Sequence, residues 1–146
     1  MHQSKRSRSK RSGSNDALPK DGIPTNVRQG GLAIVKLRGA LLNLNERYGQ
    51  CVVTAQAKME DRQNCRNDPT LCGAPAAGCD IDGLQKTVNA QIGYLEKVVA
   101  ALGRLQAKAK HPGDAMTYED QLRELAVTNE KLAALRGQCE ELKKTQ

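Results

Sequence analysis

Three equally spaced cysteines are the residues of this sequence whose types and spacing best suit chemistry. Cys65, Cys72 and Cys79 lie seven residues apart in the segment CRNDPTLCGAPAAGC, which is rich in Pro and Gly. Such thiols can ligate a metal, form disulfides or remain free. A structural zinc site usually pairs its ligands at two to four residues and needs four of them, whereas the spacing here is wider. The nearest further thiol, Cys51, falls inside a predicted helix, so we expect no metal site.

The choice between a disulfide and free thiols depends on the redox compartment. Five cysteines are an odd number, and the sequence contains neither an apolar signal segment at its N-terminus nor an N-x-S/T acceptor site. These features favour a reducing compartment. The favoured interpretation is therefore free thiols in a flexible connector, with Cys51 and Cys139 as small core hydrophobes. A Cys65–Cys79 disulfide is the alternative.

No group of residues indicates catalysis. The two histidines, His2 near the N-terminus and His111 in a predicted turn, leave little for a His-assisted nucleophile. The sequence has no phosphate-binding Gly-rich motif, and its carboxylates are scattered over outward helix faces. We expect a non-enzymatic protein with no catalytic residue, no metal ligand and no cofactor.

The apolar composition predicts a thin core. The chain has no Phe, no Trp and only three Tyr, and its apolar fraction of 38% lies below the roughly 45–50% of typical globular domains. Aromatic rings supply the largest single burials in thick cores. Leu, Val, Ile and Ala must therefore fill this core, and they fill seams between helices well. The composition favours a helical bundle or coiled coil.

Three segments repeat apolar residues at spacings of three and four, which is typical of one face of an α-helix. The predicted helices cover residues 31–64, 80–110 and 115–144, and the cysteine-rich loop covers residues 65–79. Asp80 and Thr117 are candidate N-caps, and the short connection HPGD requires the last two helices to be antiparallel. We predict an all-α fold over residues 31–146, an elongated three-helix bundle or coiled coil. The alternative is a hairpin of two helices that leaves the first helix free to pair with another chain.

The apolar positions of these heptads form a seam that we expect to serve assembly, with the chain itself or with other subunits. The predicted seam comprises Ile34, Leu37, Leu41, Leu44, Leu84, Val88, Leu95, Val98, Leu102, Leu105, Leu125, Leu132 and Leu135. Five glycines fall outside the seam, at outward positions: Gly39, Gly49, Gly93, Gly103 and Gly137. Exposed positions can tolerate such glycines, or a partner can approach closely on that outer face.

Residues 1–30 are expected to be a disordered basic tail. They carry seven Lys or Arg against two Asp and contain few apolar residues, so they cannot bury enough surface to offset chain entropy. The densest cluster consists of Lys5, Arg6, Arg8, Lys10 and Arg11. It can be a solvated tail, a patch for nuclear import or for nucleic acid, or a mitochondrial transit segment. We expect a nuclear or cytoplasmic location, with a mitochondrial one as the alternative.

Two functions follow from these features. The leading hypothesis is a non-enzymatic helical interaction or assembly protein that binds protein partners through its seams. The alternative is a nucleic-acid-binding protein whose basic tail contacts phosphate, or another polyanion, and whose helices set the oligomeric state. No apolar run approaches the ~20 residues that span a bilayer, so membrane insertion is not expected.

Overall fold

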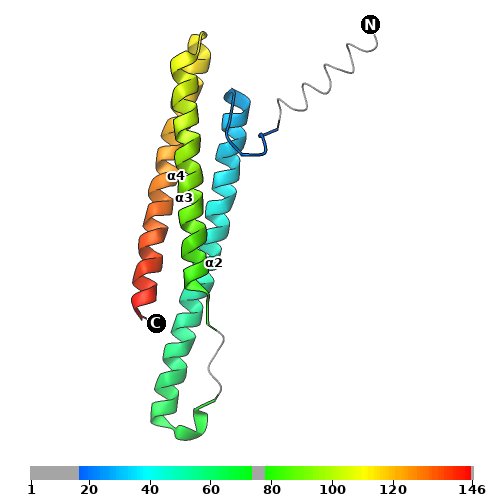
Figure 1. The fold of residues 1–146 in the computed structure, drawn as a ribbon. Coiled ribbons are helices and arrows are strands. Elements are labelled where there is room, and N and C mark those ends of the chain that lie inside the picture. Colours follow the sequence, from blue (N-terminus) through cyan, green and yellow to red (C-terminus); the bar gives the residue numbers. More distant parts are fainter. Residues whose placement is uncertain (1–16, 74–77, 146) are drawn as a thin grey trace, which may run out of the picture.

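The computed structural model describes residues 17–73 and 78–145, and these form an elongated three-helix bundle (Figure 1). The helices are α2 (Val27–Asn67), α3 (Ile81–Lys108) and α4 (Pro112–Thr145), with a short 3-10 helix η1 (Pro69–Leu71) after α2. α3 and α4 form an antiparallel hairpin, and α2 packs against both of them. The predicted all-α bundle is confirmed, and the alternative with an unpaired first helix is wrong.

The core runs along one face of each helix. Every predicted seam residue is buried except Leu105, which packs half-buried against the edge of the core. Val88, Val98 and Leu102 on α3 have no exposed surface, because α3 packs against both α2 and α4. Ile92, outside the strict heptad positions, is buried as well. The core is thus wider on α3 than a two-stranded seam requires.

Of the two predicted N-caps, one is confirmed and the other is wrong. Asp80 caps α3 as expected, because its carboxylate accepts a hydrogen bond from the Gly83 backbone N–H at 2.9 Å. Thr117 does not cap α4, which already begins at Pro112. Proline suits the first turn of a helix, since its fixed φ is already helical and its missing N–H would have no intrahelical partner there. The Thr117 hydroxyl instead donates to the Gly113 carbonyl, one turn earlier.

The predicted tail boundary at residue 30 is wrong, because α2 begins at Val27. The side chain of Asn26 accepts a hydrogen bond from the Gln29 N–H at 2.9 Å, and the Gln29 side chain accepts one from the Thr25 N–H at 2.8 Å. This reciprocal pattern resembles a capping box, and Asn followed three residues later by Gln was the signal for it. Residues 1–16, which include the basic cluster from Lys5 to Arg11, lie outside the described residues.

Residues 17–26, here called the N-terminal strap, fold back onto the bundle. Leu18 packs against the core, and the Gln29 side chain donates to the Ala17 carbonyl at 3.1 Å. Gly22 adopts a φ of 75°, a conformation that favours glycine. The Tyr94 hydroxyl of α3 donates to the Gly22 carbonyl at 2.7 Å. The strap therefore belongs to the folded unit.

Polar contacts fix the register of α4. At its C-terminal end, the Lys143 ammonium donates to the Gln85 side chain at 2.9 Å and pairs with Asp82 at 2.8 Å, both on α3. Near its other end, the Gln121 amide donates to the Val27 carbonyl of α2 at 2.9 Å. A Cβ at Gly30 would overlap this amide, so the Gln121 side chain would have to shift to admit any other residue there.

Candidate interaction surface

The predicted seam lies inside a single chain. Its residues from α2, α3 and α4 pack against one another in one core, so a folded chain has already filled the apolar faces that the heptads create. A partner that binds the folded chain must therefore contact another face. The structure offers two such features, the outward face of α2 and the end of α2 that extends beyond the bundle.

The outward face of α2 carries a row of apolar and small residues, here called the outer stripe. It consists of Val35, Gly39, Leu42, Glu46, Gly49 and Val53. Their spacings of four and three place them on one face of the helix. Val35, Leu42 and Val53 are 62%, 71% and 64% exposed. A helix surface that faces water normally carries charged or polar side chains at such positions.

The glycines of the outer stripe have no role in packing within the described chain. No described atom lies within 4 Å of the position that a Cβ would take at Gly39 or Gly49, and the same holds for Gly93, Gly103 and Gly137. The prediction that these glycines point outward is confirmed. The sequence analysis did not identify Val35, Leu42 and Val53, the apolar residues of the outer stripe. Their spacing along the helix, on the side of α2 opposite the seam, could have indicated them.

The flanks of α2 are occupied, whereas the outer stripe is not. Arg38 forms an ion pair with Glu124 of α4, and the Lys36 ammonium lies 4.9 Å from the centre of the Tyr94 ring of α3. α3 and α4 both lie on one side of α2 (Figure 1). The outer stripe therefore faces away from the rest of the described bundle.

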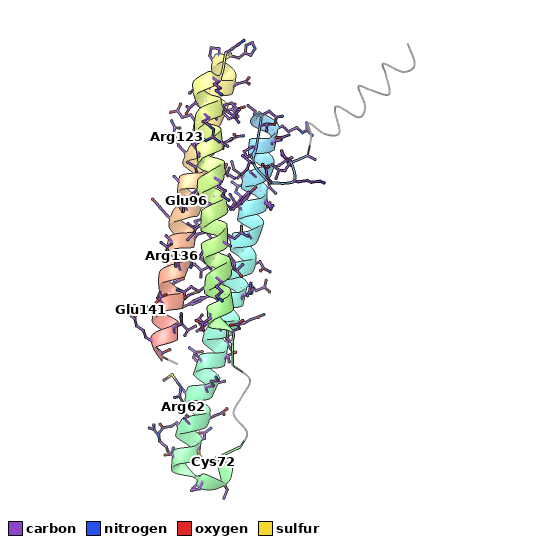
Figure 2. The ribbon with its side chains drawn as sticks, in the orientation of Figure 1. Arg62, Cys72, Glu96, Arg123, Arg136 and Glu141 are labelled. Atoms are coloured by element: carbon purple, nitrogen blue, oxygen red, sulfur yellow. A yellow bond between two sulfur atoms is a disulfide. The ribbon has the colours of Figure 1, made fainter. Side chains whose placement is uncertain are left out.

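The last turns of α2 extend past the end of the bundle. This arm consists of α2 residues 52–67 with the following residues 68–73, and no described residue within it belongs to the core. Figure 2 shows Arg62 and Cys72 on the arm, beyond the level of Glu141 near the end of α4. Met59 and Leu71 add exposed apolar surface to the arm.

Two disulfides fix the arm, which corrects the prediction of free thiols. Cys51 bonds to Cys79 and Cys65 bonds to Cys72, with Cα–Cα distances of 5.2 and 4.7 Å. The alternative Cys65–Cys79 bond is wrong as well. α2 extends to Asn67, so Cys51 lies at the base of the arm near the start of α3 while Cys65 lies near its tip. Cys51 is buried as predicted, but it is bonded.

The η1 turn explains the second pairing. The Asp68 carboxylate accepts hydrogen bonds from the Thr70 N–H at 3.0 Å and from its hydroxyl at 2.8 Å. Pro69 begins the 3-10 turn, which reverses the chain directly after α2. The reversal returns Cys72 to the level of Cys65. The sequence Asp-Pro-Thr between two cysteines was the local signal for this bond.

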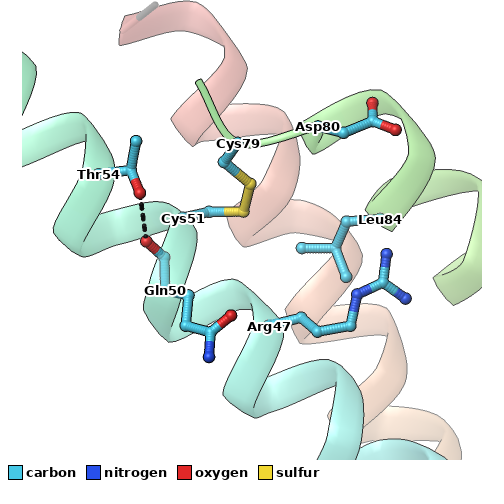
Figure 3. Close-up of a pocket in the computed structure, with 7 residues that line it drawn as sticks. All are labelled: Arg47, Gln50, Cys51, Thr54, Cys79, Asp80 and Leu84. Carbon is cyan, nitrogen blue, oxygen red and sulfur yellow. Dashed lines mark hydrogen bonds between the residues drawn. A yellow bond between two sulfur atoms is a disulfide. The ribbon is translucent and has the colours of Figure 1, made fainter. Parts of the chain in front are cut away.

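A small open hollow lies at the base of the arm (Figure 3). Its volume is about 260 Å³, and its lining consists of Arg47, Gln50, Cys51, Thr54, Cys79, Asp80 and Leu84. The disulfide occupies both cysteines, the Asp80 carboxylate caps α3, and the Thr54 hydroxyl donates to the Gln50 carbonyl. The disulfide, the Asp80 carboxylate and the Thr54 hydroxyl of this hollow are thus used for structure.

Cys139 is the one cysteine left as a free thiol. Burial raises the pKa of the Cys139 thiol, the one cysteine outside the disulfides, which disfavours the nucleophilic thiolate. Within residues 17–73 and 78–145, no group of three His, Cys, Asp or Glu could hold a metal ion. None of the described helices is both long enough and apolar enough to cross a membrane.

Comparisons with family models, with curated proteins and with solved structures find no match for this chain. Its function must therefore be inferred from its own surfaces.

Proposed function

We propose that this chain is a non-enzymatic helical interaction protein that binds protein partners through the outer stripe of α2. The observation that carries the proposal is the alignment of three largely exposed apolar side chains, Val35, Leu42 and Val53, on one helix face. Single exposed apolar residues are normal on protein surfaces, whereas apolar residues gathered in one patch mark interaction sites. The seam residues fill the core of the same chain, so the outer stripe takes the assembly role that the heptads indicated.

The glycines of the outer stripe support close contact with a partner. Each glycine in a helix interior costs about 1 kcal/mol relative to alanine. Gly39 and Gly49 bring no compensating contact within the described chain. A surface without Cβ atoms allows another backbone to approach closely. The helical period of the row, i, i+4 and i+7, fits a partner helix laid along α2.

A substitution in the centre of the outer stripe tests this proposal. Leu42→Glu places a charge where Leu42 is 71% exposed, so the bundle should fold as before while partner binding is lost. Val127→Glu on α4 is a matched control, since Val127 is an exposed aliphatic residue outside the outer stripe. The two variants and the unmodified chain would be compared by quantitative affinity capture from expressing cells. Partners lost only with Leu42→Glu support the proposal, and no such difference contradicts it.

The disulfides bear on where the protein works. A nuclear or cytoplasmic location stays a prediction. It was based in part on the expectation that the cysteines are free thiols, whereas four of the five cysteines form disulfides in the structure. Structural disulfides persist in oxidising compartments, so we propose such a compartment as the alternative. Alkylation of thiols in intact cells tests it. If four cysteines resist alkylation even after the chain is unfolded, the oxidising compartment is supported. If all five are alkylated after unfolding, the original prediction is supported.

A further inference from the structure

We propose that the partner of the outer stripe is a second copy of this chain, with the two α2 helices antiparallel across a two-fold axis level with Leu44. This inference rests on the proposed function, which makes the outer stripe a docking surface. It adds the identity of the partner and the register of the contact.

The outer stripe is complementary to itself in this arrangement. Antiparallel pairing about residue 44 places Val35 opposite Val53, Gly39 opposite Gly49, and Leu42 opposite Glu46 of the other copy. The two valines thus meet each other and the glycines meet glycines. Leu42 meets the aliphatic stem of Glu46, whose carboxylate can extend to water. A two-fold interface requires this reciprocity, because each contact occurs twice.

Charge favours the antiparallel orientation over the parallel one. Residues 27–44 of α2 contain three Lys or Arg and no acid, a net charge of +3. Residues 45–61, which would face them in the antiparallel pair, contain three acids and two bases, a net charge of −1, and the last turns of α2 beyond them add Arg62 and Arg66. Antiparallel helices place each +3 segment beside the −1 segment of the other copy, whereas parallel helices place like segments together and Glu46 opposite Glu46. Complementary potentials fix the orientation of partners, and like charges suppress wrong arrangements.

The described elements leave room for a second copy. α3 and α4 lie on the opposite side of α2 (Figure 1), and the chain returning from the arm is held at Cys51, on the buried face of α2. The outer stripe from Val35 to Val53 is about 27 Å long at 1.5 Å per residue. Contact between one pair of helices lies at the small end of specific interfaces, so the dimer should be weak.

Sedimentation equilibrium of the full chain tests self-association between about 10 µM and about 500 µM, a range that covers weak dimers. We expect the apparent mass to approach twice the chain mass at the upper end. Leu42→Glu should return it to one chain mass, and Val127→Glu should leave the dimer intact. A chain that stays monomeric throughout, or a dimer that Leu42→Glu does not weaken, would overturn the inference.

Crosslinking tests the register. Gly39→Cys and Gly49→Cys each place a new thiol where no described atom lies within 4 Å, while the native thiols are bonded or buried. With a short bis-maleimide, a mixture of the two variants should give a crosslinked dimer that neither variant gives alone. Dimers from each variant alone would indicate a parallel contact and overturn the inference. If the chain is monomeric but Leu42→Glu loses another protein in the capture experiment, the proposed function stands and this inference fails.

Discussion

Breaking the Cys51–Cys79 disulfide should lower the free energy of unfolding by about 3–4 kcal/mol. The bonded residues are separated by 28 positions. Crosslinks that close loops of 15 and 100 residues restrict the unfolded chain by roughly 3 and 4.7 kcal/mol, so this bond falls between them. In the folded chain, the 2% exposed Cys51 ties α2 to the start of α3, where Ile81 and Leu84 enter the core.

Urea denaturation of the Cys79→Ser variant measures this loss, since the free energy of unfolding falls linearly with urea concentration. The melting temperature should fall by roughly 10 °C, because 1 kcal/mol shifts it by about 2–4 °C in chains of similar or somewhat larger size. Cys72→Ser is the control. It breaks a bond between residues only seven positions apart at the tip of the arm, outside the core, and should cost less.

A melting curve of Cys79→Ser that matches the unmodified chain would refute this reasoning. So would five reactive thiols in the unfolded, unreduced protein, because one is expected, from Cys139. Equal losses for Cys79→Ser and Cys72→Ser would contradict the separation of the arm from the core.

Four further predictions follow from single contacts. Leu95→Ala should lower the free energy of unfolding by about 2–5 kcal/mol in urea titration, because Leu95 of α3 is buried in the core. Gly22→Ala should speed hydrogen exchange in the N-terminal strap, since the backbone has a positive φ and the new Cβ would lie 2.9 Å from an aromatic ring. A hydrogen bond from Lys143 lowers the pKa of Asp82 in the folded chain. The ionised Asp82 therefore stabilises the fold fully above the ordinary aspartate pKa, and this stabilisation is lost as pH falls through the lower folded pKa. In Lys143→Gln, the free energy of unfolding measured between these two pKa values should depend less on pH. If the basic cluster contacts nucleic acid, deletion of residues 1–16 should abolish salt-dependent binding to RNA or DNA, and binding that survives the deletion would place the site elsewhere.

The three helices could be predicted because heptad spacing is a local property of the sequence. Positions such as Leu37 and Leu125 are buried whichever helix covers them, so the seam indicated the core correctly. Heptads do not show whether the covering helix belongs to the same chain or to another one. That choice depends on the loops and on all three helices together, and the structure places the seam within one chain.

The errors arose where contacts distant in sequence decide the local structure. The first helix was predicted to begin at residue 31, yet α2 begins at Val27 and runs through Gly30 and Gly31, and Gln121 occupies the space where a Cβ at Gly30 would lie. The first disulfide depends on how far α2 extends and on where α3 begins. The equal spacing of Cys65, Cys72 and Cys79 in the sequence indicates neither where α2 ends nor where α3 begins.

The Cys51–Cys79 disulfide is also a second covalent connection between the two ends of the arm, in addition to the peptide chain. A protease that cuts within residues 52–73 would leave two fragments joined through Cys51 and Cys79, separable only after reduction. Because no described residue of the arm belongs to the core, whole helical turns could be removed or inserted there without repacking α3 and α4. The bundle therefore sets the stability of the protein, and the length of the arm can change with little effect on it.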